Sequence, residues 1–71
     1  MTTELIKELV GLAVEKADNL NALLDIQYIN CYGVTVKIYT SSVDVAIIKA
    51  DRKKPQTPAK LQAAIDKVKA L

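Results

Sequence analysis

Apolar residues recur at helical spacing through the first twenty residues of the chain. Placed on a helix, one broad face carries the apolar side chains Leu5, Ile6, Leu9, Val10, Ala13, Ala17 and Leu20. The acidic side chains Glu4, Glu8 and Glu15 lie on the other side. Such a one-sided pattern is typical of a helix that packs against a core. It predicts a helix from about residue 3 to about residue 20.

The middle of the chain alternates between apolar and polar residues, as half-buried strands do. Alternation begins at Leu24 and changes phase at Ile29 and Cys31, which indicates a strand with a bulge or an early end. A bend at residues 30–33 follows. Residues 34–40 then alternate cleanly, with Val34, Val36 and Ile38 on one face, and residues 43–47 alternate again.

A two-residue turn at Ser41-Ser42 would join the last two strands into a hairpin. It pairs Ile38 with Val45 and Val36 with Ile47, so that all four lie on one face. Ser-Ser lacks the glycine or Asn-Gly that tight hairpins prefer, and a longer loop of the same parity would keep these pairs.

A second helix is predicted from about residue 58 to the end, because Thr57-Pro58 is an N-cap followed by proline at the first helical position. The expected fold is α+β: one domain over residues 1–71, ordered α-β-β-β-α, with both helices on one face of a three-stranded antiparallel sheet. The predicted core consists of Val36, Ile38, Val45, Ile47, Leu9, Val10, Ala13, Leu61, Ile65 and Val68.

The other sheet face is predicted to be open. With Ile48 opposite Thr35, this face carries Tyr39 and Ile48 as exposed apolar side chains, while the faces of Tyr28 and Tyr32 stay undecided. Exposed apolar residues and unpaired strand edges on so small a domain favour self-association. We therefore expect a homodimer formed through Tyr39 and Ile48.

The composition removes most catalytic chemistry. The chain has no histidine, one cysteine and two glycines, so it lacks the commonest general base, a disulfide, a zinc ligand set and a phosphate-cradling loop. We expect no enzyme activity and no catalytic, cofactor or metal site. Cys31 is interpreted as a small buried hydrophobe.

Charge is divided unevenly along the chain. Residues 1–48 hold three lysines against six acidic residues, a net −3, whereas residues 49–71 hold seven basic residues against two acidic ones, a net +5. The basic residues around the start of the second helix are Lys49, Arg52, Lys53, Lys54 and Lys60. Because Lys60 opposes the helix dipole there, this segment is the candidate binding site. Its alternative interpretation is a solvated loop that aids solubility.

Ala59-Lys60 and Ala63-Ala64, together with the α-β-β-β-α order, resemble the double-stranded RNA-binding domain. The resemblance covers the order of the elements and part of the second helix. The chain departs from the family in lacking a Gly-Pro-x-His loop between its first two strands, and its paired lysines precede Pro55. No residue role is therefore carried over.

The function we expect is a small non-enzymatic, cytoplasmic protein-interaction module that occupies a surface of a partner protein. Its size is similar to that of compact inhibitors and accessory proteins, many of them encoded by phages and mobile elements. The alternatives are nucleic-acid binding through residues 49–60 and a structural homo-oligomer. No apolar run approaches the ~18 residues of a membrane span, so we expect no membrane partner.

Overall fold

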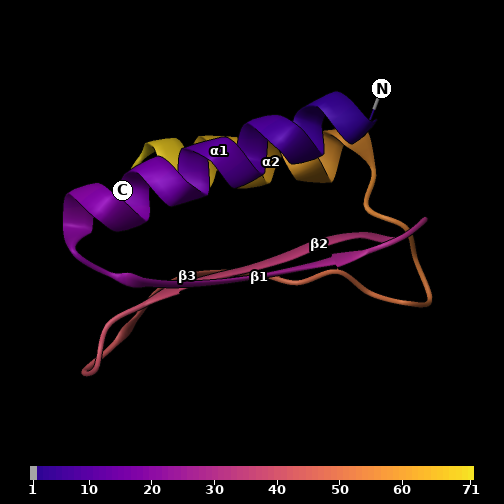
Figure 1. The fold of residues 1–71 in the computed structure, drawn as a ribbon. Coiled ribbons are helices and arrows are strands. Elements are labelled where there is room, and N and C mark those ends of the chain that lie inside the picture. Colours follow the sequence, from indigo (N-terminus) through magenta and orange to yellow (C-terminus); the bar gives the residue numbers. More distant parts are fainter. Residues whose placement is uncertain (1) are drawn as a thin grey trace.

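Two helices cover one face of a three-stranded antiparallel sheet. The structure is a computed structural model, and it describes residues 2–71. The elements are α1 (Thr2–Leu20), β1 (Leu23–Ile29), β2 (Gly33–Tyr39), β3 (Asp44–Ile48) and α2 (Pro58–Lys69). β2 is the central strand, so β1 and β3 form the two edges of the sheet. Figure 1 shows α1 and α2 packed together above it. The predicted α-β-β-β-α fold is confirmed.

α1 ends in a Schellman motif, a left-handed cap that turns the chain back beneath the helix. Asn21 adopts a φ of 53°, and its N–H donates to the carbonyl of Asp18 at 3.2 Å. The N–H of Ala22 donates to the carbonyl of Ala17 at 2.8 Å. Asparagine tolerates this backbone conformation better than most residues. The cap therefore lets β1 begin three residues after the helix ends.

The core lies between the helix layer and β2. Side chains that are fully or almost fully buried there are Leu9, Ala13, Ala17, Val34, Val36, Ile38, Ala46, Leu61, Ala64, Ile65 and Val68. The predicted core positions on both helices and on β2 are confirmed, apart from Val10, which is only partly buried against this cluster.

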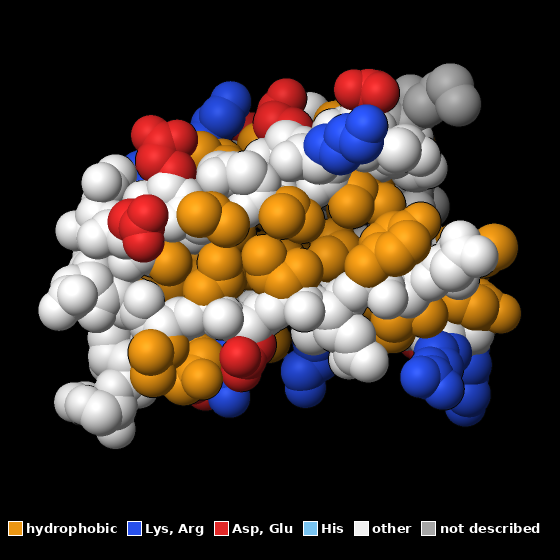
Figure 2. Space-filling model, in the orientation of Figure 1, with side chains coloured by type: hydrophobic (Ala, Val, Ile, Leu, Met, Phe, Trp, Pro, Cys, Tyr) orange, Lys and Arg blue, Asp and Glu red, His pale blue; other side chains and the backbone are white. Residues whose placement is uncertain are grey.

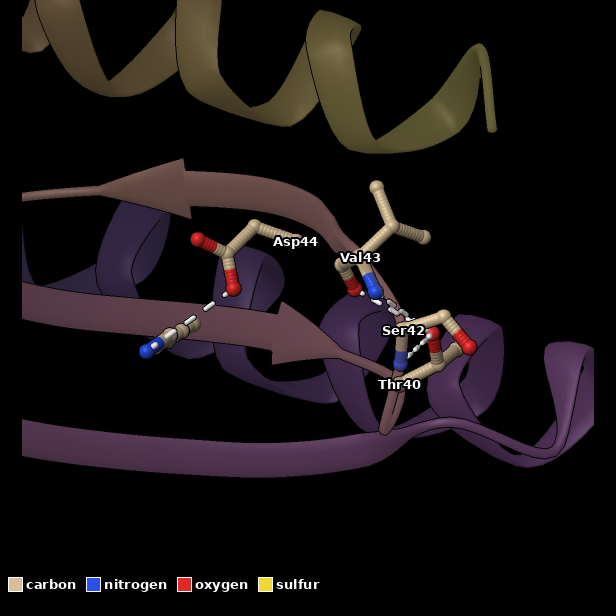
Figure 3. Close-up of polar contacts among 5 residues, drawn as sticks. Thr40, Ser42, Val43 and Asp44 are labelled. Carbon is tan, nitrogen blue, oxygen red and sulfur yellow. Dashed lines mark hydrogen bonds and ion pairs between the residues drawn. The ribbon is translucent and has the colours of Figure 1, made fainter.

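The turn between β2 and β3 has two residues, as predicted. Thr40 N donates to the carbonyl of Val43 at 2.8 Å and closes the turn around Ser41-Ser42. The Thr40 hydroxyl accepts from Ser42 N at 3.3 Å and Val43 N at 3.1 Å, as Figure 3 shows. A threonine side chain thus satisfies backbone groups in a turn that contains no glycine.

Beyond this turn the predicted register is wrong by one residue. Ile38 pairs with Ala46 and Val36 pairs with Ile48, because a β-bulge at Val45 adds one residue to β3. Since side chains alternate with a period of two, one extra residue moves every later side chain to the opposite face. Ile48 therefore packs against the core, and Ile47 takes the open-face position that was predicted for Ile48. Val45 itself is only partly buried.

β1 ends early at Ile29, and it pairs with β2 without a register shift. The turn at residues 30–32 follows, close to the predicted bend. Tyr28 lies opposite Val34, so it points to the helix side of the sheet. Cys31 sits in the turn with a φ of 72° and is exposed, so the prediction of a buried cysteine is wrong.

Candidate functional site

The loop between β3 and α2 is shaped by Asp51. The Asp51 Oδ1 accepts a hydrogen bond from Lys53 N at 2.8 Å, and the Asp51 carbonyl accepts one from Lys54 N at 3.3 Å. Aspartate often folds the chain back on itself in this way. Arg52 and Lys53 form the exposed tip of the resulting turn, and Lys54 returns toward the body of the protein.

Gln56 fastens the end of this loop to β2. Its backbone N donates to the carbonyl of Tyr32 at 2.7 Å. Its side-chain amide accepts from Val34 N at 2.8 Å and donates to the carbonyls of Val34 at 3.1 Å and Lys49 at 3.3 Å. Because β3 ends at Ile48, Val34 has no strand partner on this side, and the Gln56 amide takes that place.

Gly33 makes room for the Gln56 amide. A Cβ at position 33 would overlap the Gln56 side chain, and the φ of 131° at Gly33 favours glycine over other residues. Glycine at position 33 therefore allows both the backbone conformation at the start of β2 and the close approach of the Gln56 side chain that holds the loop.

α2 begins as its sequence predicts. Thr57 is the N-cap, and its Oγ1 accepts a hydrogen bond from Lys60 N at 3.2 Å. Pro58 occupies the first helical turn, and the first turn contains no acidic residue. Lys60 thus projects from the positive end of the helix, where a lysine is locally unfavourable by ~0.3–1 kcal/mol.

These segments border an open surface pocket of about 290 Å³ beside β3 and the start of α2. Its positive charge comes from Lys49 and Lys54, at the start and near the end of the loop, and from Lys60 in the first turn of α2. Ile48, Ala63 and Ala64 form its apolar part on the helix side of the sheet, and Ile47, Asp51 and Gln56 complete the lining. We call this the basic pocket.

Three of the five predicted basic residues therefore come together. Arg52 and Lys53 are exposed at the loop tip and do not line the basic pocket. Within residues 2–71, the ion pair between Lys37 and Asp44 at 3.8 Å is the only one, so none of the three pocket lysines forms an ion pair, although Asp51 also lines the basic pocket. Their ammonium groups are available to an anionic ligand.

The sequence predicted the lysines of the basic pocket but not its apolar part. Ile48 was assigned to the open face, and only the bulge at Val45 brings it beneath α2. Ala63 and Ala64 have no distinguishing pattern, because alanine is common in helices. No feature of the sequence marks the bulge.

The two residues predicted to mediate self-association, Tyr39 and Ile48, lie on opposite faces of the sheet. Tyr39 lies on the open face, where the Lys37 Nζ is 4.9 Å from the centre of its ring. The negative charge of Asp25 raises the pKa of Tyr39 above its usual value. Ile48 lies on the opposite face, so the two residues cannot form one surface.

In the part of the chain that the structure describes, no three cysteine, aspartate or glutamate side chains cluster as metal ligands would. None of the helices within residues 2–71 has the length and apolar character needed to cross a membrane. Comparisons with protein-family models, with curated proteins and with solved structures found no match to the chain.

Proposed function

We propose that the protein is a non-enzymatic, cytoplasmic interaction module of the inhibitor or accessory type, which binds an acidic surface of a partner protein. The observation that carries this proposal is that Lys49 and Lys54, from the loop between β3 and α2, line one pocket together with Lys60 from α2. The three lysines are exposed and form no ion pair, and they outnumber Asp51 in the lining, so the basic pocket favours an anionic group.

The apolar part of the basic pocket restricts which side chains of a partner can bind there. Ile48 and Ala63 offer aliphatic surface next to the lysine ammonium groups. An aspartate or glutamate flanked by an aliphatic side chain complements both features at once. Charge complementarity of this kind directs partners together and excludes wrongly charged ones.

A phosphate backbone matches the same surface less well. Nucleic-acid binders usually present a basic face across the whole domain. Here residues 1–48 carry a net −3, from three lysines against six acidic residues, and Arg52 and Lys53 lie outside the basic pocket. The lysines of the pocket are therefore set for a compact acidic group.

The substitution Lys60→Glu tests the basic pocket without destabilising the fold. Glutamate three residues after Thr57 completes a capping box and suits the positive end of α2, so this variant is expected to be more stable by ~0.3–1 kcal/mol. It also reverses one charge of the basic pocket. Capture of the stoichiometric protein partner from a lysate of the native host, measured by mass spectrometry, is expected to fall at least tenfold.

Lys67→Glu is the matched control. Lys67 is exposed in the last turn of α2, outside the basic pocket, and glutamate there opposes the helix dipole. This control loses stability but is expected to retain the partner. Equal loss of capture in the two variants, or release of the captured material by nuclease, contradicts the proposal.

A further inference from the structure

The edge of the sheet opposite the basic pocket has free hydrogen-bonding groups. On β2, both backbone groups of Val34 bond to Gln56, on the side away from β1. Tyr28 lies opposite Val34, so in an antiparallel ladder its own backbone groups also point away from the partner strand. The same alternation applies to Ile26 and Leu24, which lie two and four residues earlier on β1. These three residues direct their N–H and C=O groups to the free edge.

The side chains of the same residues face a groove beside α1. Leu24, Ile26 and Tyr28 share the helix side of the sheet, yet Ile26 is 38% exposed and Tyr28 is 60% exposed. Figure 2 shows a continuous band of hydrophobic side chains between α1 and β1. The helix layer thus leaves the apolar side of β1 partly uncovered.

α1 supplies the other side of this groove. Ile6, Val10 and Val14 recur every four residues and so follow one flank of the helix. Ile6 and Tyr28 line one small cavity, which identifies this as the flank toward β1. Val14 is 45% exposed. We call the surface formed by Leu24, Ile26, Tyr28 and this flank the apolar groove.

β1 also lacks the features that keep sheet edges from pairing. β3 has five residues and a bulge, whereas β1 has seven residues with an unbroken register. β1 contains no lysine and no proline, the residues that commonly block edge pairing. Its one charged side chain, Asp25, lies on the face opposite the apolar groove.

We propose that β1 pairs with β1 of a second copy of the chain, in antiparallel register about a two-fold axis at Ile26. This register joins the two three-stranded sheets into one continuous sheet. Each of its pairs matches in character: Ile26 with Ile26, Leu24 with Tyr28, Leu23 with Ile29, and Asp25 with Gln27. All seven residues of β1 take part, and the groups of Leu24, Ile26 and Tyr28 form roughly six hydrogen bonds.

Other registers are worse for reasons of charge and length. A shift by two residues in one direction sets Asp25 opposite Asp25 of the second copy, and like charges in that position are destabilising. The opposite shift sets Asp25 against Ile29. Both shifts shorten the ladder, and a shift by one residue misaligns the free backbone groups.

The helices are also spaced for this arrangement. α1 packs on both β1 and β2. With strands about 4.8 Å apart, a helix above that pair lies about 10 Å from its copy across the axis, which is near the spacing of packed helices. The two copies of α1 would then cover Val10, Val14 and Ile26. The basic pockets would remain free at the far edges of the joined sheet.

Two substitutions of Gln27 test the dimer in a way that loss of the fold cannot mimic, because they are expected to change its dissociation constant in opposite directions. The proposed dimer contains two symmetry-related pairs of Gln27 with Asp25 of the second copy. Gln27→Glu is therefore expected to raise the dimer dissociation constant roughly three- to thirtyfold. Gln27→Lys is expected to lower it. Within one chain, position 27 lies diagonal to Lys37 on β2 and two residues from Asp25 on the same face, so the two charges offset each other and both variants are expected to fold. Dissociation constants that shift in opposite directions for the two variants support the proposal.

Ile26→Lys tests the axis itself, with Val43→Lys as control. Val43 is 60% exposed in the turn before β3, far from β1 in the pairing order. Light scattering at up to about 100 µM is expected to give twice the 7.8 kDa chain mass for the native protein and for Val43→Lys. Ile26→Lys is expected to give the single-chain mass, with circular dichroism unchanged. A native protein that stays monomeric, or Gln27 variants that shift in the same direction, overturns the proposal.

Discussion

The side chain of Gln56 forms the hydrogen bonds to β2 that the backbone of a neighbouring strand would otherwise form. Its amide pairs with both backbone groups of Val34 at the point where β3 has ended, and its own N–H bonds to Tyr32. One glutamine therefore ties the loop that holds Lys54 to the central strand. The position of the pocket lysines depends on this attachment.

Gln56→Ala is expected to lower the free energy of unfolding by about 1–3 kcal/mol, because it leaves the partly buried N–H and C=O of Val34 without partners. Urea unfolding measures this change. Gln62→Ala is the matched control, since Gln62 is exposed and bonds only to Asp66 one helical turn away. A loss in Gln56→Ala no larger than that in Gln62→Ala would show that the amide does not hold the loop.

This role could not have been predicted from the sequence. Gln56 and Val34 are separated by 22 positions, and nothing local distinguishes this glutamine from any other in a polar loop. Its partner is left free only because β3 stops at Ile48. Thr57-Pro58, in contrast, is a local signal, and it identified the start of α2 correctly.

At the scale of elements, the helices and the strand order follow from periodicity, whereas the face of β3 does not. Helical and strand periods are properties of neighbouring residues. The bulge at Val45 is a feature of the pairing between two strands, which the alternation along either strand does not show. A single inserted residue then reversed the assignment of Ile47 and Ile48.

The two isoleucines give a direct test of this register. Ile48→Asp is expected to cost about 2–4 kcal/mol of folding stability, because it places a carboxylate against the core beneath α2. Ile47→Asp is expected to cost about 1 kcal/mol or less, since its side chain is on the open face. Thermal or urea unfolding of the pair measures the difference. A larger loss of stability in Ile47→Asp than in Ile48→Asp would instead indicate the regular hairpin register without the bulge.

In the protein as a whole, the two edges of the sheet have different surfaces. The β3 edge contains the bulge, ends at Ile48, is continued by Gln56 and is flanked by the three lysines of the basic pocket. The β1 edge carries an apolar groove and unpaired backbone groups. Recognition of an acidic partner and pairing with a second copy are therefore compatible within one assembly.

Nuclear magnetic resonance of the isotope-labelled chain, titrated with the partner purified by capture, locates the surface where that partner binds. Binding at the basic pocket is expected to shift the amide signals of the loop around Lys54 and of the first two turns of α2, from Lys60 to Ala64. Shifts confined to β1 and the α1 flank of the apolar groove would show that the partner binds elsewhere.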